Sequence, residues 1–328
     1  MTTTTRAAQI VEQGRVVCVD TPVEDLREGD LRVHSAYASI CGSDLHVVND
    51  MVETVPALWK PGYPGHEGIG EVIESRADGF VPGDKVLCVP VVPEARCFME
   101  IQRIRATSTI KLEGDLPPLD QVLMAQQLGT VIYANRQHPT DVTGQTVAVL
   151  GQGSAGLFWA WLMKRLGAAR VIVADLSPAR LAASPGFGAD VALDANEVDV
   201  TEAVLDLTGG QGADYVVEAV GRRQTLLQSV SLVRPDGGLF WFGLPDSNEP
   251  VPIDFRLFFR KRLRAHSTYG AQGEPGFVSF RMALEHIRRG DIDVTPLLSH
   301  VLPIEDVERA FVLADSRDEN ALKVSVAF

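Results

Sequence analysis

Two short segments in the first third of the chain carry side chains that could bind a transition metal. The segment CGSDLH at 41–46 supplies Cys41, and the segment GHEG at 65–68 supplies His66 and Glu67. Thiolate and imidazole are ligands that zinc prefers, and both lie beside glycines, where the backbone can bend. Either residue alone is as readily explained by a buried cysteine or a polar turn. The indication of a metal site therefore depends on their combination.

A glycine-rich segment in the middle of the chain has the spacing of a dinucleotide-binding loop. Gly151, Gly153 and Gly156 directly follow a Val-rich run and precede a helical pattern. The first glycine permits a tight turn, the second lets a pyrophosphate approach the backbone, and the third lets helix and strand pack closely. Asp175 ends the next strand-like run, where a carboxylate binds the ribose hydroxyls of NAD and repels the 2′-phosphate of NADP. We therefore predict an NAD site rather than a chance glycine cluster with Asp175 as a helix cap.

The elements that must position these residues fall into two classes. Up to about residue 120, short Val- and Ile-rich runs are separated by turns rich in Pro and Gly, which is typical of a β barrel or sandwich. Over 146–267, short apolar strands alternate with helices, which predicts a doubly wound parallel sheet. A helix at 276–289 and a strand at 321–327 follow, and this tail could return to pack on the β-rich part. A long helix is expected at 119–135.

Composition excludes several classes of partner. The 328 residues include 30 Lys and Arg against 43 Asp and Glu, which gives a net charge of −13. Binding to nucleic acid or to an anionic membrane needs clustered basic residues, so we expect neither partner. The sequence contains no run of about 18 apolar residues and no signal-peptide pattern. The four cysteines are too few for a disulfide scaffold, and we expect a cytoplasmic protein with reduced thiols.

The order of the three motifs resembles that of a known family. CGSDLH at 41–46, GHEG at 65–68 and GQGSAG at 151–156 are similar to the motifs of the zinc-dependent medium-chain alcohol dehydrogenases, and the tail at 291–314 resembles the sorbitol and threonine dehydrogenase branch. The resemblance covers nearly the whole chain. It implies an α/β plus β fold, in which a GroES-like β module contains an inserted Rossmann domain with a doubly wound parallel sheet.

The resemblance also implies domain boundaries and a missing lobe. The GroES-like catalytic domain is expected at 1–121 and 268–328, and the NAD-binding Rossmann domain at 122–267. The family usually carries a lobe with four cysteines that bind a structural zinc, but here Pro90 runs almost directly to Cys97. We therefore expect one catalytic zinc and no structural zinc.

Roles for the metal-binding residues follow from the same resemblance. Cys41 and His66 would bind the zinc, and Glu67 would lie beside it as a ligand that exchanges with solvent. Asp44 would hold the imidazole of His66 and fix its tautomer. Gln126 falls where the family has Cys, Glu or Asp as the remaining ligand. Direct binding by Gln126, binding through water and no binding all remain open.

The family's chemistry gives the expected reaction. Ser43 would accept the proton of the substrate hydroxyl, and His46 would pass it to solvent. The chain would transfer hydride reversibly between a secondary alcohol or polyol and NAD, with a ketone as the other small-molecule partner. A zinc-free NADPH-dependent quinone or enoyl reductase of the same superfamily is the alternative, and it leaves the metal-binding residues unexplained. A non-catalytic scaffold would have no use for Ser43 and His46.

Association between copies of the chain is also expected. The segment LFWFGL at 239–244 could end the Rossmann sheet as an apolar edge strand, and uncovered edges tend to be paired or covered. Members of the family often form dimers or tetramers through this region, so a homodimer or homotetramer is expected. A helix at 255–261 could instead cover the edge.

Overall fold

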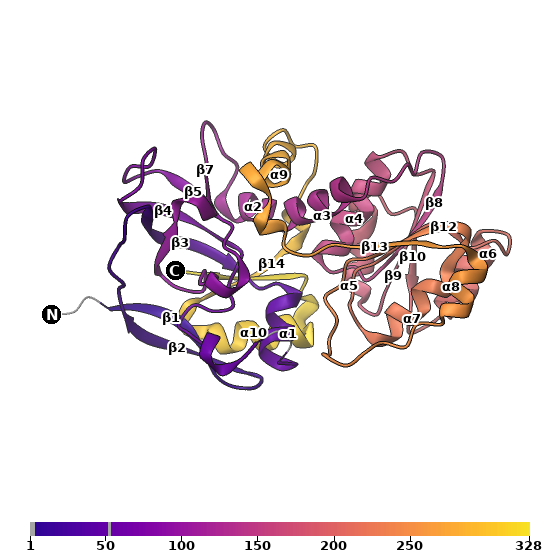
Figure 1. Ribbon diagram of the computed structural model, residues 1–328, viewed down its shortest axis with the longest axis horizontal. Helices are drawn as coiled ribbons and strands as arrows, with labels where there is room; N and C mark the ends of the chain where they lie inside the picture. The colour runs from indigo at the N-terminus through magenta and orange to yellow at the C-terminus, as the bar shows by residue number, and fades with distance from the viewer. Residues whose placement is uncertain (1–3, 52–53) are drawn as a thin grey trace. The chain divides into compact units, whose positions relative to one another are not determined.

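The computed structural model describes residues 4–51 and 54–328, which form two compact units (Figure 1). One unit runs to Thr130 and resumes at Gln272–Phe328, and the other is Val131–Ala271. The boundaries expected from the sequence, 121/122 and 267/268, stay predictions. In the described part of the chain, no helix is long and apolar enough to cross a membrane.

The first unit is built on β-sheets. A seven-stranded sheet has the order β14-β15-β3-β4-β5-β7, with β6 paired to β3, and β1 and β2 form a separate two-stranded sheet. All these pairs are antiparallel except β14 with β15. The strands are β1 (Thr4–Glu12), β2 (Arg15–Pro22), β3 (Asp30–Ser39), β4 (Gly68–Ser75), β5 (Lys85–Cys88), β6 (Ile101–Arg105), β7 (Thr109–Lys111), β14 (Leu298–Pro303) and β15 (Lys323–Ala327). The strand β1 was not expected from the sequence.

The tail of the chain completes this sheet. β15 pairs with β3, with Ser325 opposite Ser39, and the N–H of Ile40 donates to the carbonyl of Val324 over 2.9 Å. The helix α10 (Val307–Ser316) packs on β15 and β2. The return of the tail to the β-rich part, which the sequence suggests, is therefore observed.

Four further helices belong wholly or partly to this unit. They are α1 (Gly42–Asn49), α2 (Leu119–Leu123), α3 (Ala125–Gln137) and α9 (Val278–Arg288). The helix expected at 119–135 is two helices, because α2 ends at Leu123 and α3 begins at Ala125. Gly129 permits α3 to lie close to α9, since a Cβ at that position would fall 2.8 Å from the Cα of Phe280.

The second unit is a parallel sheet of six strands in the order β10-β9-β8-β11-β12-β13. Its strands are β8 (Thr146–Leu150), β9 (Arg170–Asp175), β10 (Val191–Asp194), β11 (Ala213–Glu218), β12 (Val233–Trp241) and β13 (Arg264–Ser267). Its helices are α4 (Ser154–Arg165), α5 (Pro178–Ala183), α6 (Val200–Leu207), α7 (Arg223–Leu232) and α8 (Phe255–Lys261). The apolar strand sequences suit a parallel sheet that is buried on both faces. The predicted doubly wound sheet is confirmed.

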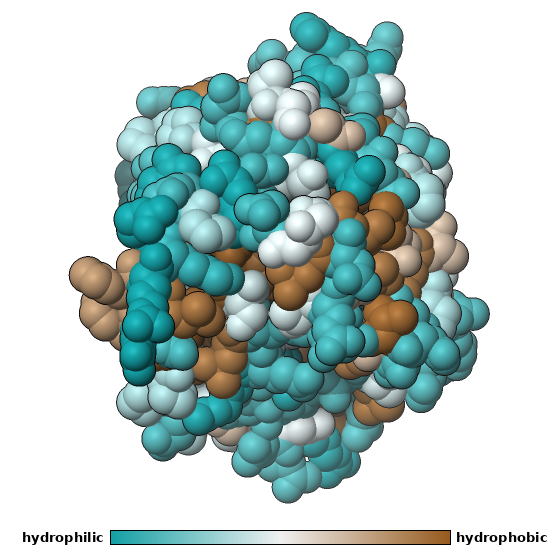
Figure 2. All heavy atoms as spheres, turned by 90° about the vertical axis from the view of Figure 1, so that its right-hand side faces the viewer, coloured by the Kyte–Doolittle hydropathy of each residue, from teal (hydrophilic) through white to brown (hydrophobic). Residues whose placement is uncertain are grey.

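The expected edge position of the segment 239–244 is wrong. β13 pairs with β12 on its outer side, with Phe240 opposite His266. Leu239 and Phe240 are fully buried, so this segment is apolar because it lies inside the sheet. The exposed apolar groups of this region belong to α8 instead, where Phe255 and Phe259 are 70% and 71% exposed. Figure 2 shows hydrophobic side chains gathered among hydrophilic ones on one face.

Candidate functional site

Three potential metal ligands meet where β3 ends and β4 begins. Cys41 follows β3, and His66 and Glu67 directly precede β4; the pairing of Ala38 with Gly68 brings these two ends together. One ligand atom from each of Cys41, His66 and Glu67 lies within 4.8 Å of the others. Within residues 4–51 and 54–328, no other group of three or more His, Cys, Asp or Glu side chains is arranged to hold a metal.

The imidazole of His66 is oriented by its neighbours. Its Nδ1 lies 3.0 Å from Oδ1 of Asp44 and 3.3 Å from the carbonyl oxygen of Pro64. The carboxylate oxygen is closer and carries the charge, but its geometry is not that of a hydrogen bond, so Asp44 acts on the imidazole through its charge. The other carboxylate oxygen of Asp44 accepts the backbone N–H of Cys41 over 2.9 Å. Asp44 thus connects the two ligand segments and leaves Nε2 of His66 available to a metal.

The charges around His66 favour a cation. Burial opposes a charged imidazole, but the carboxylate of Asp44 and the thiol group of Cys41 outweigh burial and hold the pKa of His66 well above its ordinary value. A metal ion binds the neutral imidazole and the thiolate, so it would take the place of protons here. The donor set of thiolate, imidazole and carboxylate therefore fits zinc.

Glu67 has a buried cationic partner. Its Oε2 lies 2.7 Å from Nζ of Lys323, and the hydroxyl of Ser39 donates to the same oxygen. The side chains of Glu67 and Lys323 are only 1% and 2% exposed. Burial would raise the pKa of Glu67, but Lys323 and His66 outweigh it and lower that pKa. Burial likewise lowers the pKa of Lys323, and Glu67 more than reverses this effect.

Two glutamines at the start of α3 approach the ligand segments. The amide of Gln126 donates to the carbonyl oxygen of His66 over 3.1 Å. The amide nitrogen of Gln127 lies 3.6 Å from Sγ of Cys41, and its oxygen lies 3.4 Å from Nζ of Lys323. Metal binding by Gln126 stays a prediction. Gln127 and Lys323 were not expected at this site, although a lysine within an apolar strand sequence was a signal that could have been followed.

Helix α1 presents the two residues expected to move protons. Ser43 and His46 are three residues apart and therefore share one face of the helix. The hydroxyl oxygen of Ser43 lies 3.4 Å from Nε2 of His66. Nδ1 of His46 lies 2.7 Å from Oδ2 of Asp50, a partner that the sequence did not suggest. The role of Ser43 and His46 in proton transfer stays a prediction.

The glycine-rich loop joins β8 to α4 in the second unit. Gly151 has a φ of +85°, which favours glycine. A Cβ at Gly156 would fall 1.8 Å from the carbonyl oxygen of Gly151, so this close approach requires glycine. Gly153 is the residue just before α4, and a Cβ there would meet only Arg180 at 3.8 Å. Open backbone at the start of a helix is suited to binding a pyrophosphate.

Asp175 at the end of β9 stabilises the same loop. Its Oδ2 accepts the backbone N–H of Gln152 over 2.5 Å, and its Oδ1 accepts that of Ser177 over 2.8 Å. The guanidinium of Arg180 lies 4.0 Å from Oδ2 of Asp175. Arg180 was not expected from the sequence at this loop. The loop, the carboxylate and the open backbone at Gly153 fit a dinucleotide.

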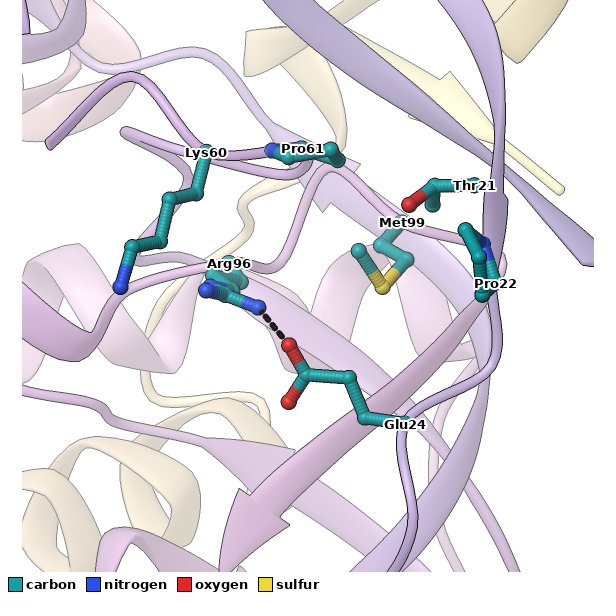
Figure 3. A pocket seen from close by; sticks show the side chains of 7 residues that line it. All are labelled: Thr21, Pro22, Glu24, Lys60, Pro61, Arg96 and Met99. Atoms are coloured by element: carbon teal, nitrogen blue, oxygen red, sulfur yellow. Dashed lines mark hydrogen bonds and ion pairs between the residues drawn. The ribbon is translucent and has the colours of Figure 1, made fainter. Parts of the chain in front are cut away.

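A separate cavity of about 290 Å³ lies in the first unit (Figure 3). Its lining includes Lys60, Arg96 and Glu24, and none of its lining residues belongs to the metal cluster. Arg96 and Arg103 both pair with Glu24, and the described residues that line this cavity include no Cys or His. We therefore place the candidate site at the cluster of Cys41, His66 and Glu67.

Two family models match the chain. The model described as "Alcohol dehydrogenase GroES-like domain" matches residues 27–114, and the model described as "Zinc-binding dehydrogenase" matches residues 155–285. The first match contains the metal cluster, and the second begins within the glycine-rich loop.

Relatives match over nearly the whole length. An alcohol dehydrogenase of Cupriavidus necator is 25% identical over 99% of each chain, and an L-threonine 3-dehydrogenase of Bacillus velezensis is 27% identical over 90% of each. The crystal structure of an alcohol dehydrogenase from Thermotoga maritima has a TM-score of 0.81 at 25% identity, with 99% of each chain covered.

Proposed function

Since this chain belongs to the zinc-type medium-chain alcohol dehydrogenase family, we propose that it transfers hydride reversibly between a secondary alcohol or polyol and NAD. The convergence of Cys41, His66 and Glu67 carries the proposal, because a thiolate, an imidazole and a carboxylate together form a zinc-binding set. The relatives reported above are named as dehydrogenases, which does not favour a zinc-free quinone or enoyl reductase.

Cys41, His66 and Glu67 would hold a single catalytic zinc, with Gln126 as a candidate further ligand. When bound, zinc supplies Lewis acidity, which lowers the pKa of an alcohol. Asp44 would hold the imidazole of His66 at Nδ1, which leaves Nε2 available to the zinc. We propose no structural zinc.

Ser43 and His46 would remove the hydroxyl proton of the substrate. Ser43 lies beside His66 and can accept a proton from an alcohol at the cluster. His46 shares the helix face of Ser43, and the contact of its Nδ1 with Oδ2 of Asp50 would orient the ring for proton release to solvent. General acid–base assistance of this kind contributes roughly 10²- to 10⁴-fold to a rate.

Residues of the second unit would bind NAD. The open backbone at Gly153 and the N-terminus of α4 would bind the pyrophosphate, with Gly151 and Gly156 maintaining the shape of the loop. Asp175 would accept the ribose hydroxyls, and its charge would disfavour the 2′-phosphate of NADP. Bound NAD supplies the hydride acceptor.

Assembly and location are further parts of the proposal. We propose a homodimer or homotetramer contact at the edge strand β13 and the helix α8 that precedes it, where Phe255 and Phe259 are exposed. A cytoplasmic location suits the four free cysteines. Analytical ultracentrifugation of wild type and of F255S/F259S tests the contact, because a monomer in both cases would contradict it.

The function is tested on purified protein with a panel of secondary alcohols and polyols. NADH formation is followed by absorbance, and zinc content is measured by elemental analysis. We expect about one zinc per chain, activity with NAD above that with NADP, and loss of activity after chelation that added zinc restores. Less than half an equivalent of zinc with activity that resists chelators, or reduction of quinones by NADPH, would contradict the proposal.

A further inference from the structure

Lys323 brings a fixed positive charge into the metal cluster. Its ammonium lies 2.7 Å from Glu67 and 3.4 Å from the side-chain oxygen of Gln127, and it is 2% exposed. A buried ammonium is costly unless it is paired. The ammonium of Lys323 therefore lies beside Glu67, a candidate zinc ligand. The ammonium and a zinc ion must compete for the negative charge of the Glu67 carboxylate.

The position of Lys323 is set by the sheet. Lys323 begins β15, and the pairing of Ser325 with Ser39 fixes that strand against β3. The hydroxyl of Ser39, at the end of β3, donates to the same oxygen of Glu67 that Lys323 contacts. One oxygen of Glu67 is thus held by two donors from paired strands.

These contacts have two consequences for a metal at the cluster. Because Oε2 is held by Lys323 and Ser39, Glu67 can offer its other oxygen to a metal without losing its partners. The ammonium also draws charge from the carboxylate and repels a divalent cation, so Glu67 becomes a weaker ligand. Without metal, the same ammonium compensates the buried carboxylate, whose isolation would otherwise be strongly destabilising.

We propose that Lys323 is an internal counter-cation of the metal site, which stabilises the metal-free protein, lowers zinc affinity and keeps Glu67 an exchangeable ligand. This inference rests on the proposed function, since it concerns the same zinc. Lys323 is a positioning residue that acts through Glu67, and nothing in the proposal requires it to touch the substrate.

The experiment compares zinc affinity in wild type, K323Q and K323R by competition with a chromophoric chelator. Loss of the ammonium should tighten zinc binding. Coupling between two binding events typically changes an affinity by about 5- to 150-fold, and we expect an increase in zinc affinity within this range for K323Q. K323R keeps the positive charge, so its zinc affinity should remain nearer to that of wild type. K323Q should also melt at a lower temperature than wild type after chelation, with a smaller difference when zinc is bound.

A double-mutant cycle separates action through Glu67 from a general charge effect. E67Q removes the charged partner, so K323Q/E67Q has a neutral pair and avoids the isolated buried charge that could prevent K323Q from folding. If Lys323 acts through Glu67, K323Q should change zinc affinity much less in the E67Q background than in wild type. An equal increase in both backgrounds would overturn the role of Glu67.

The remaining outcomes distinguish the two proposals. Failure of wild type to bind zinc would contradict the proposed function. Normal zinc binding by wild type, with unchanged or weaker zinc binding by K323Q, would overturn the role of Lys323 alone. Cobalt substitution adds a readout independent of activity, because a change in the ligation of Glu67 should alter the visible spectrum of the bound ion in K323Q.

Discussion

The metal cluster and the glycine-rich loop are two binding sites built in opposite ways. At the cluster, charged side chains from three separate segments meet, and they include Cys41, His66 and Lys323. At the loop, consecutive residues present open backbone, and the decisive side-chain property of Gly156 is the absence of a Cβ. The first site therefore depends on charge and the second on space.

This difference predicts how each site should respond to substitution. Removal of a ligand from the cluster takes away chemistry but leaves the strands paired, because the ligands lie at strand ends. Addition of a single methyl group at the tightest point of the loop must move backbone, because the nearest atom is the carbonyl oxygen of Gly151. Function and stability should thus be separable at Cys41 and inseparable at Gly156.

The largest effect is expected for C41A. Loss of the thiolate should remove zinc, and Lewis-acid stabilisation worth several kcal/mol corresponds to a loss of at least about 10³-fold in kcat. NAD binding, measured by calorimetry, should be retained because the glycine-rich loop is in the other unit. C18A is the matched control, since Cys18 is half-buried on β2 and outside the cluster. Zinc retained by C41A would contradict the assignment.

The next effect is expected for G156A in comparison with G153A. The new Cβ of G156A meets backbone at 1.8 Å, so we expect a loss of about 3 kcal/mol in the free energy of unfolding together with loss of NAD binding. G153A meets only a guanidinium at 3.8 Å and should unfold like wild type while binding NAD more weakly. Chemical denaturation and NAD titration measure both, and equal stabilities of the two variants would refute the distinction.

A smaller effect is expected for D44N. Partners that orient a metal-binding histidine typically contribute 10- to 100-fold to metal affinity, and Asp44 lies 3.0 Å from Nδ1 of His66. D50N is the matched control, because Asp50 contacts His46 rather than a proposed ligand. Chelator competition should show weaker zinc binding by D44N only. Equal affinities in D44N, D50N and wild type would place the orienting function elsewhere.

Sequence patterns predicted the parallel sheet and the segments that carry the metal ligands. The alternation of strands and helices around Gly151 predicted the parallel sheet, because each strand is apolar and short. The resemblance of the segments 41–46 and 65–68 to family motifs implied that Cys41 and His66 lie together, and the structure brings both together.

Contacts between distant segments could not be predicted in the same way. The pairing of β15 with β3 decides where Lys323 lies, and no local pattern encodes that register. The segment 239–244 was assigned to an edge because apolarity alone does not distinguish an edge from the interior of a sheet. The partner strand β13 has only four residues, of which three are polar, so its composition carried little indication of its pairing.

The smallest effect is expected for the ionisation of Glu218, a buried glutamate whose partners differ from those of Glu67. Glu218 at the end of β11 is fully buried, like Glu67, but burial raises its pKa, and no hydrogen bond partner of its Oε2 lies in residues 4–51 and 54–328. Its Oε1 accepts the N–H groups of Val220 and Gly221 and the hydroxyl of Thr225 over 2.8–2.9 Å. Among the residues that the structure describes, no lysine pairs with Glu218, whereas Lys323 pairs with Glu67.

The sign of the resulting pH dependence follows from the raised pKa of Glu218. The folded state retains the proton longer than the unfolded state, so stability is greatest below the ordinary pKa of about 4.3 and falls as the pH rises through the folded value. The change is about 1.4 kcal/mol for each unit by which the pKa is raised. E218Q cannot ionise at this position, so the effect of its new amide on stability is the same at every pH. The melting temperature of wild type minus that of E218Q should therefore be larger at about pH 4 than at about pH 8. A constant difference across this range would show that the folded protein does not favour the protonated form of Glu218.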